Sequence, residues 1–271
     1  MTEHESWQVS GDAAEVYERC FVPAIFGRWA PQIAEAVSVA SEDRVLDVGC
    51  GTGVLARAAA DRVADESQVT GLDLNEGMLT VARRLRPQID WRQGDATELP
   101  FPAESFDVVM SQFSLMYFPD RSAAIREMVR VLRPDGRLAV AVWGPYERAS
   151  GYVILTEIAK RRCGQAAADV LTAPFVLGEE NALRVLFREA GVDEPNIELR
   201  DGTITFPSIE VFVETEVDGS PLEDLLDEES YRGLMQEARE ALQPFCIEGG
   251  EVVMPMDAFV MTSNAAPSEA S

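Results

Sequence analysis

The sequence predicts an α/β fold built on a mostly parallel β-sheet, and two observations carry that prediction. Between Arg44 and Trp143, short apolar runs alternate with stretches of helical spacing, as in successive βαβ units. The first apolar run ends in a cluster of glycines, at the edge where open α/β sheets bind their ligands. The length of 271 residues favours a single domain, residues 1–271, with insertions.

Residues 40–145 are predicted to form the ligand-binding core of this domain. Its apolar runs predict strands at residues 44–49, 68–73, 89–94, 106–111 and 137–143. The stretches between them predict helices at residues 52–63, 75–86 and 120–132. Asn75 is a suitable N-cap, Pro87 ends the second helix, and a turn at residues 133–136 closes the third.

The flanks of the core are predicted to be mainly helical. Helices are expected at residues 13–26, 31–39, 152–162 and 179–190, and two long strands at residues 196–206 and 251–262. An acidic, helix-prone insert with an apolar stripe, residues 208–246, separates these strands. We expect segments 10–39, 149–177 and 208–249 to form a helical lid over the carboxyl end of the sheet. The tail, residues 264–271, is expected to be disordered.

Composition disfavours several kinds of partner. Asp and Glu total 47 against 23 Lys and Arg, and the resulting net charge of -24 repels nucleic acids and anionic lipid surfaces. The polar start of the chain and the absence of a long apolar run predict neither a signal peptide nor a membrane span. Four scattered cysteines favour reduced thiols in the cytoplasm. With His4 as the single histidine and no metal-ligand spacing, we expect no metal site.

The glycine cluster at residues 49–53 leaves two cofactor interpretations open. Residues 51–56 match the dinucleotide fingerprint G-x-G-x-x-[GA], and Asp73 follows about 20 residues later, which would suggest NAD. Asp47, however, stands directly before the glycines, where its charge would repel a pyrophosphate and attract a ligand that carries an ammonium and a sulfonium. Gly49, Gly51 and Gly53 also let the backbone approach a ligand closely.

Residues 45–56 resemble the first motif of class I, Rossmann-like, S-adenosylmethionine-dependent methyltransferases. The resemblance continues through Asp73, residues 94–96 and residues 131–138. Within this class, the chain is similar to the ubiquinone/menaquinone-type group of small-molecule methyltransferases. It implies a seven-stranded mixed sheet of order 3-2-1-4-5-7-6 whose last strand is antiparallel. Residues 251–262 would be that strand, placed beside residues 137–143 and paired with residues 196–206.

The resemblance also implies roles for the residues at the strand ends. Asp73 would accept hydrogen bonds from both ribose hydroxyls, and Asp95 one from the adenine amino group. Asp47, with backbone carbonyls near Gly49 and Ser111, would hold the methionine ammonium. The full set of expected cofactor-binding residues is Asp47, Gly49, Cys50, Gly51, Gly53, Asp73, Leu74, Met78, Gly94, Asp95, Ala96, Ser111 and Gln112. Leu74 and Met78 would flank the adenine, and the backbone N–H of Ala96 would donate to a ring nitrogen.

Methyl transfer from a sulfonium is an in-line displacement, so alignment and the exclusion of water supply much of the rate. A base is needed only if the acceptor must lose a proton. Tyr17, Tyr117, Glu214 and Glu216 are candidates by residue type alone, and no catalytic residue is assigned.

Residues 111–114, Ser-Gln-Phe-Ser, do not match the N-P-P-Y motif of nucleic-acid or glutamine methylation. A small organic acceptor, apolar or cationic and selected by the lid, therefore remains as the expected substrate of a monomer or homodimer. An NAD-dependent oxidoreductase and a non-catalytic S-adenosylmethionine-binding protein are the alternatives.

Overall fold

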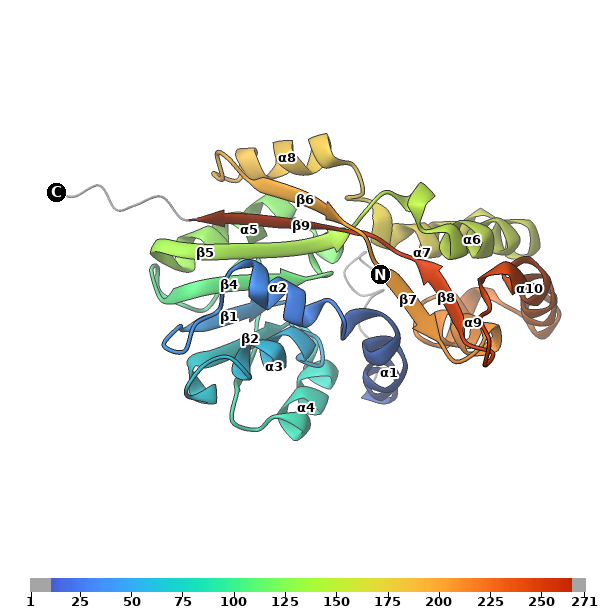
Figure 1. Ribbon diagram of the computed structural model, residues 1–271, viewed down its shortest axis with the longest axis horizontal. Coiled ribbons are helices and arrows are strands. Elements are labelled where there is room, and N and C mark those ends of the chain that lie inside the picture. The colour runs from blue at the N-terminus through green and yellow to red at the C-terminus, as the bar shows by residue number, and fades with distance from the viewer. Residues whose placement is uncertain (1–10, 265–271) are drawn as a thin grey trace.

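The computed structural model describes residues 11–264, and within that range seven strands form one twisted sheet (Figure 1). The order is β3-β2-β1-β4-β5-β9-β6. Strands β1 to β5 pair in parallel, and β9 is antiparallel to both β5 and β6. The strands are β1 Val45–Val48, β2 Val69–Asp73, β3 Asp90–Gln93, β4 Phe106–Gln112, β5 Leu132–Trp143, β6 Asn196–Arg200 and β9 Ala258–Asn264. The predicted fold class and strand order are confirmed.

Helices cover the sheet, which explains why all four residues of β1 are buried. α2 (Ala30–Ala36) packs beside α3 (Val54–Ala60), and α5 (Arg121–Val131) packs beside α8 (Glu180–Glu189). The side chain of Asn75 caps α4 (Glu76–Leu85) by accepting hydrogen bonds from the N–H groups of Gly77 and Met78, as predicted. The helical periods of the core are therefore confirmed, with ends shifted by one to three residues.

The predicted helix at residues 13–26 forms, but its second half is not a regular α-helix. α1 (Gly11–Val16) runs into a π-helical segment, η1 (Tyr17–Phe26), which contains Pro23. The wider π-helical turn closes with a hydrogen bond from the N–H of Gly27 to the carbonyl of Val22, at 2.7 Å. Pro23 itself lacks an N–H, so this end of the segment departs from regular α-helix.

Two further boundaries differ from the prediction. The expected turn at residues 133–136 lies inside β5, where Leu132 pairs with Phe106 and Arg137 pairs with Val108, and Asp135 between them has a φ of 63°. The predicted turn is thus a bulge within a strand that begins earlier. Of the predicted disordered tail, Asn264 ends β9, and residues 265–271 lie outside the described residues, as does His4.

Both long C-terminal strands are broken, which corrects the expectation of two continuous strands. β7 (Thr203–Phe206) and β8 (Val252–Pro255) form a separate two-stranded antiparallel sheet beyond β6 and β9. At the break, the N–H of Gly202 donates to Asp257 Oδ1 at 3.0 Å, and the N–H of Met256 donates to the carbonyl of Gly202 at 2.9 Å. A Cβ on Gly202 would lie 2.2 Å from the ring of Trp29, so only glycine fits this bend.

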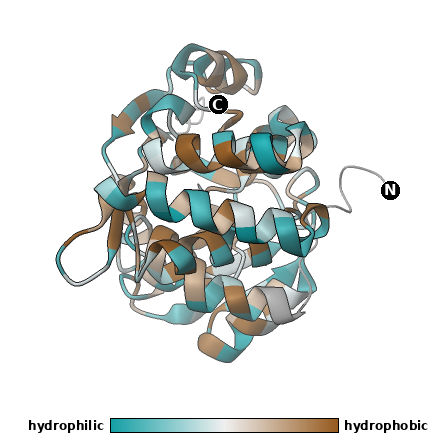
Figure 2. Ribbon diagram, turned by 90° about the vertical axis from the view of Figure 1, so that its right-hand side faces the viewer, coloured by the Kyte–Doolittle hydropathy of each residue, from teal (hydrophilic) through white to brown (hydrophobic). Residues whose placement is uncertain are grey.

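The acidic insert forms α9 (Ile209–Asp218) and α10 (Glu228–Ala241). With α6 (Ser150–Cys163) and α7 (Gln165–Thr172), they build a helical layer beyond the carboxyl ends of the strands, on the right of Figure 1. Seen from that side, the helices carry both hydrophilic and hydrophobic residues, as amphipathic helices do (Figure 2). Among residues 11–264, no helix is both long enough and apolar enough to cross a membrane.

Candidate active site

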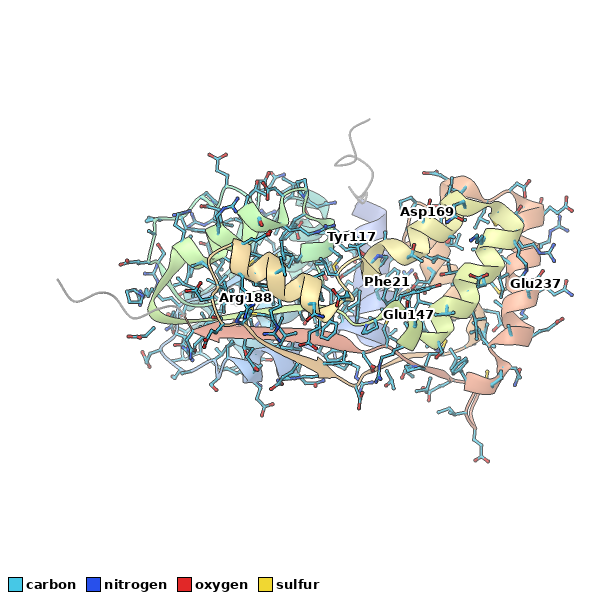
Figure 3. The ribbon with its side chains drawn as sticks, turned by 90° about the horizontal axis from the view of Figure 1, so that it is seen from above. Phe21, Tyr117, Glu147, Asp169, Arg188 and Glu237 are labelled. Carbon is cyan, nitrogen blue, oxygen red and sulfur yellow. The ribbon has the colours of Figure 1, made fainter. Side chains whose placement is uncertain are left out.

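A cavity of about 290 Å³ lies between the carboxyl ends of the parallel strands and the helical layer. Phe21 and Tyr117, which lie between the sheet and the helices in Figure 3, are part of its wall. On the sheet side it is lined by the predicted cofactor-binding residues Gly49, Gly51, Asp73, Leu74, Met78, Gly94, Asp95, Ala96 and Gln112. The remaining four predicted residues, Asp47, Cys50, Gly53 and Ser111, lie behind this wall.

Gly51 and Gly53 have different roles in the glycine loop. Gly51 has a φ of 55°, and the nearest atom to a Cβ there would be Cε1 of Tyr17 at 3.9 Å, so its backbone borders open space. Gly53 has a φ of 87°, and its Cβ would lie 2.2 Å from the ring of Trp91. Gly51 therefore allows a ligand to approach, whereas Gly53 allows Trp91 to pack beneath the loop.

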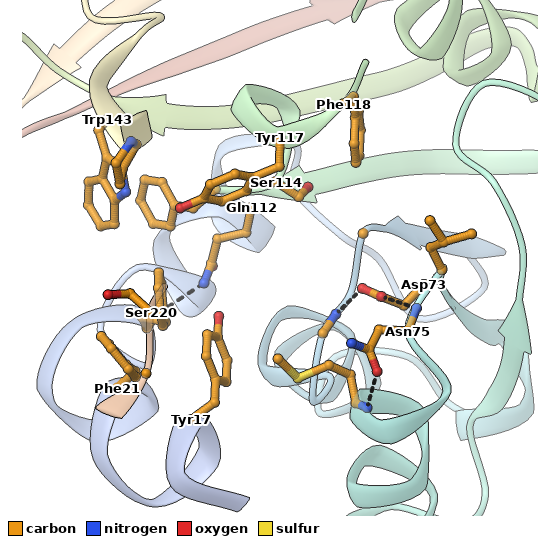
Figure 4. A pocket seen from close by; sticks show the side chains of 18 of the residues that line it. Tyr17, Phe21, Asp73, Asn75, Gln112, Ser114, Tyr117, Phe118, Trp143 and Ser220 are labelled. Atoms are coloured by element: carbon orange, nitrogen blue, oxygen red, sulfur yellow. Dashed lines mark hydrogen bonds between the residues drawn. The ribbon is translucent and has the colours of Figure 1, made fainter. Parts of the chain in front are cut away.

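Asp73 holds the loop to the next strand. Its Oδ2 accepts a hydrogen bond from the N–H of Gly51 at 2.7 Å, and its Oδ1 accepts one from the N–H of Asn75 at 2.8 Å (Figure 4). Burial raises the pKa of Asp73, and the backbone donors oppose that rise. Each carboxylate oxygen can accept a second hydrogen bond, so Asp73 retains the capacity to receive two hydroxyl groups.

Thr97 holds the carboxylate of Asp95 in place. Oδ1 of Asp95 accepts hydrogen bonds from the N–H and the hydroxyl of Thr97, both at 2.8 Å. This pair of bonds fixes the carboxylate in a turn directly after β3, with Ala96 beside it in the cavity wall. The turn thus presents an acceptor and a backbone N–H from consecutive residues.

Two buried acceptor oxygens at the end of β1 and β4 suit a ligand that donates hydrogen bonds. Asp47 Oδ2 accepts from the N–H of Ala56 at 2.9 Å, but Asp47 Oδ1 and Gln112 Oε1 have no hydrogen-bond partner within residues 11–264. Burial raises the pKa of Asp47 to about 8. An ammonium group would supply both N–H donors and a compensating charge, whereas a pyrophosphate only accepts hydrogen bonds. Asp47 does not line the cavity, so its contact with a methionine ammonium remains a prediction.

Ser111 ties the two strands together behind the wall. Its hydroxyl donates to the carbonyl of Val48 at 2.8 Å and lies 2.7 Å from the hydroxyl of Ser114. The side chain of Ser111 is thus committed to the protein, and a cofactor contact would come from its backbone.

The other half of the cavity is aromatic. Phe113 and Trp143 stack with their ring centres 3.6 Å apart and their planes 7° apart, and Tyr17 stacks on Phe26 at 5.1 Å. Further rings in the wall are Phe21, Tyr117, Phe118 and Tyr152. These residues come from η1, from the chain after β4, from the end of β5 and from α6, so their assembly depends on the tertiary fold.

One carboxylate lies among these rings. Glu216 on α9 is buried in the cavity wall, and the hydroxyl of Tyr152 donates a hydrogen bond to Glu216 Oε1 at 2.5 Å. Burial raises the pKa of Glu216 to about 7, and the Tyr152 hydrogen bond opposes the rise. The pKa of Tyr117 is also raised, by burial and by the charge of Glu216.

Residues 46–140, which contain the glycine loop, Asp73 and Asp95, match a family model described as a methyltransferase domain. This part of the chain is thus similar to methyltransferase domains. A demethylmenaquinone methyltransferase from Renibacterium salmoninarum is 39% identical to this chain over 157 residues, which are 55% of this chain and 65% of that protein. One from Listeria welshimeri is 40% identical over 117 residues, 41% of this chain and 50% of that protein. The chain thus spans less than two thirds of these relatives.

Solved structures show the same fold as this chain. The YcgJ protein from Bacillus subtilis superposes with a TM-score of 0.59 at 18% identity, covering 89% of this chain and 99% of that one. A phosphoethanolamine N-methyltransferase 2 from Haemonchus contortus, solved with S-adenosyl-L-methionine, gives a TM-score of 0.60 at 19% identity, covering 99% of this chain and 60% of that one. The predicted resemblance to class I methyltransferases is confirmed.

Of the four candidate bases in this chain, Tyr17, Tyr117 and Glu216 line the cavity, whereas Glu214 is exposed. The sequence carried a signal that distinguishes the two glutamates. Ile209, Val213 and Glu216 fall on one helical face with Phe212 and Val217, and Glu214 does not. The aromatic chamber had no such signal, because its rings belong to separate elements.

Proposed function

We propose that this protein is an S-adenosylmethionine-dependent methyltransferase that methylates a small organic acceptor. The observation that carries the proposal is the continuity of one cavity, which joins Gly51 and Asp73 at the glycine loop to Glu216 and Tyr152 in the aromatic chamber. The methyltransferase-domain match supports this interpretation over an NAD-dependent oxidoreductase, as do the unpartnered acceptor oxygens of Asp47 and Gln112 within residues 11–264.

We place the methyl donor along the sheet side of the cavity. Asp73 would receive the ribose hydroxyls, Asp95 and the N–H of Ala96 the adenine edge, and Leu74 and Met78 would flank the ring, since these residues line the cavity. Gln112, which lines the cavity, would receive the ammonium, with the buried carboxyl group of Asp47 behind it. S-adenosylmethionine supplies a methyl group already activated on a sulfonium, so the protein contributes alignment and exclusion of water.

We assign the choice of acceptor to the three predicted lid segments. Each supplies part of the aromatic chamber, exemplified by Phe21, Tyr152 and Ser220. Stacked rings favour a flat apolar acceptor, and the quinone named for the relatives is one such molecule. The lining residues include no Lys, Arg or His among those the structure describes, so the chamber offers no counter-ion to an anionic acceptor.

The test combines ligand binding with transfer. S-adenosylmethionine and S-adenosylhomocysteine should each raise the melting temperature, because binding to the native state alone stabilises it by about 2.7 kcal/mol at 100-fold saturation. Donor with a labelled methyl group should then label 1,4-naphthohydroquinone, kept reduced during the assay. A melting shift with NAD and none with S-adenosylmethionine would refute the proposal, and binding without transfer to any acceptor would favour a non-catalytic binding protein.

A further inference from the structure

We propose that Glu216 accepts a proton from the methyl acceptor, and that the acceptor presents to it a hydroxyl group on an aromatic ring. The inference rests on the proposed function and adds to it a catalytic residue and a chemical requirement on the substrate. It starts from position: Glu216 is the one carboxylate that α9 contributes to the wall of the aromatic chamber within residues 11–264.

The geometry leaves Glu216 with accepting capacity. Tyr152 donates to Oε1 at 2.5 Å, which anchors the carboxylate to α6 and leaves Oε2 for another donor. Tyr152 is itself buried, so the pair stands in a buried, ring-lined space. A group that donates a hydrogen bond and can release its proton is the natural complement to such an oxygen.

No positive side chain compensates Glu216 in the described part of the cavity wall. The other carboxylates of that wall, Asp73 and Asp95, belong to the sheet side, where backbone N–H groups hold them. A buried carboxylate without a cation costs several kcal/mol of desolvation, and such groups concentrate at functional sites. Glu216 is therefore better explained by a bound acceptor than by the stability of α9.

The charge of the donor decides between a hydroxyl and an amine as acceptor group. A protonated amine would bring a second positive charge beside the sulfonium in a cavity of low dielectric constant, where like charges repel strongly. A ring hydroxyl arrives neutral. When its O–H bond breaks, the proton goes to Glu216, and the phenolate oxygen, now negative, is attracted to the sulfonium. The new oxygen–methyl bond forms as the sulfur–methyl bond breaks, which releases neutral S-adenosylhomocysteine.

The electrostatic surroundings support the assignment. The titratable groups that face Glu216 are Tyr152 on α6 and Tyr117 in the turn after β4, and both are phenols whose pKa values are raised by burial. Burial raises the pKa of Glu216 to about 7, close to the value that makes a carboxylate an effective base at neutral pH. Tyr152 acts through Glu216 and is a positioning residue.

Three probes with one ring system test the proposal: 2-naphthol, 2-(aminomethyl)naphthalene, which is a protonated amine at neutral pH, and 2-naphthoic acid, each with labelled S-adenosylmethionine. We expect 2-naphthol to be methylated in preference to the other two. Glu216→Gln, which can still accept from Tyr152, should lower kcat for 2-naphthol about 100-fold or more while the Kd for S-adenosylmethionine changes less than about twofold. Glu216→Asp should recover part of kcat. Glu214→Gln, the matched change on the exposed side of α9, should leave kcat unchanged.

Several results would overturn the proposal. One is a Glu216→Gln variant that keeps more than about a third of the wild-type kcat, and another is preferential methylation of 2-(aminomethyl)naphthalene or 2-naphthoic acid. A third is failure of 2-naphthol to bind the complex of the protein with S-adenosylhomocysteine, measured by calorimetry. If Glu216→Gln does not fold, a Glu216→Asp variant with wild-type kcat and an unchanged pH profile has the same consequence. Failure of the wild-type protein to bind S-adenosylmethionine would instead refute the proposed function itself.

Discussion

Glu18 and Arg57 form an ion pair of 2.8 Å that joins η1 to α3, with each side chain about 19% exposed. The guanidinium of Arg57 also donates to the carbonyl of Thr52 at 2.6 Å, inside the glycine loop. One arginine thus connects the N-terminal segment to the loop, and Tyr17, the neighbour of Glu18, lies beside Gly51. This pair holds η1 against the sheet side of the cavity.

Glu18→Gln should therefore weaken both the fold and the binding of the donor. We expect the free energy of unfolding in urea to fall by about 1–2 kcal/mol, because a half-buried guanidinium loses its partner. The Kd for S-adenosylmethionine should rise about fivefold. Glu15→Gln is the control, since the pair of Glu15 with Arg84 is more than half exposed on both sides. Equal effects of the two substitutions would contradict this role for Arg57.

Gly53→Ala should destabilise the protein through a clash with Trp91. The substitution combines a left-handed backbone with a Cβ 2.2 Å from the indole ring, and we expect a loss of about 3 kcal/mol in urea unfolding. Gly191→Ala separates the two causes, because Gly191 follows the end of α8 with a φ of 93° and has no atom within 4 Å of its Cβ position among the described residues. It should cost only about 1 kcal/mol. Similar losses would mean that the Trp91 ring moves aside freely.

Asp73→Asn should reduce donor affinity more than it reduces stability. Both oxygens of Asp73 accept backbone hydrogen bonds, and the amide can keep only one of them, so a moderate stability loss is expected with the loop still formed. The melting shift produced by S-adenosylmethionine should largely disappear. Circular dichroism of the unliganded variant provides the control, and a full ligand shift in a folded Asp73→Asn protein would exclude the ribose contact.

The buried carboxyl of Asp47 should make stability depend on pH. Its pKa is raised from 3.8 to about 8 in the folded state, so the folded protein holds a proton that the unfolded chain releases. The contribution of Asp47 to stability is then complete below about pH 4 and is lost as the pH rises through about 8. We compare the free energy of unfolding in urea of Asp47→Asn with that of the wild type. The variant should gain stability relative to the wild type when the pH is raised from about 6 to about 9.

The same carboxyl offers a test of the ammonium contact. A bound cation favours ionised Asp47, so binding of S-adenosylhomocysteine near pH 7 should release a proton. Calorimetry in buffers of different ionisation enthalpy measures that release, which should be largely absent in Asp47→Asn. If wild type and variant release the same number of protons, the ammonium lies elsewhere.

Tyr152→Phe should shift the pH dependence of methyl transfer. Tyr152 lowers the pKa of Glu216, so its removal raises that pKa further. Because transfer requires ionised Glu216, kcat rises with pH, and the midpoint of the rise should move from near 7 to a higher pH. At a pH well above both midpoints, the variant should approach the wild-type kcat. An unchanged midpoint would show that Glu216 is not the titrating group.

The sheet was predictable because its determinants are local. Apolar runs such as residues 45–48 and the glycines that follow them specify a strand and a tight turn regardless of distant contacts. The break at Gly202 was not predictable, because it depends on Trp29 from the N-terminal region and on Asp257 from the next strand. The bulge at Asp135 likewise depends on how β5 pairs with β4.

Part of the candidate site could also be predicted from the sequence, and part could not. Asp73 follows a strand at the carboxyl edge of the sheet, so its position in the cavity wall could be inferred from the βαβ pattern. The aromatic chamber unites rings such as Phe26 and Trp143, which are more than 100 residues apart in sequence and meet only through tertiary packing. Glu216 could be named only by residue type, and its place on the apolar face of α9 is the signal that separates it from the exposed Glu214.

The broken strands place α9 and α10 at the tip of a hairpin. β6 with β7, and β8 with β9, form one long bent hairpin, and α9 and α10 occupy its tip. Insertions, deletions or exchanges at a hairpin tip leave the pairing along its arms intact. An ancestral protein could therefore acquire new substrate preferences through changes in residues 207–251 alone. The donor-binding edge, which is built from β1 to β4 earlier in the chain, would remain unchanged.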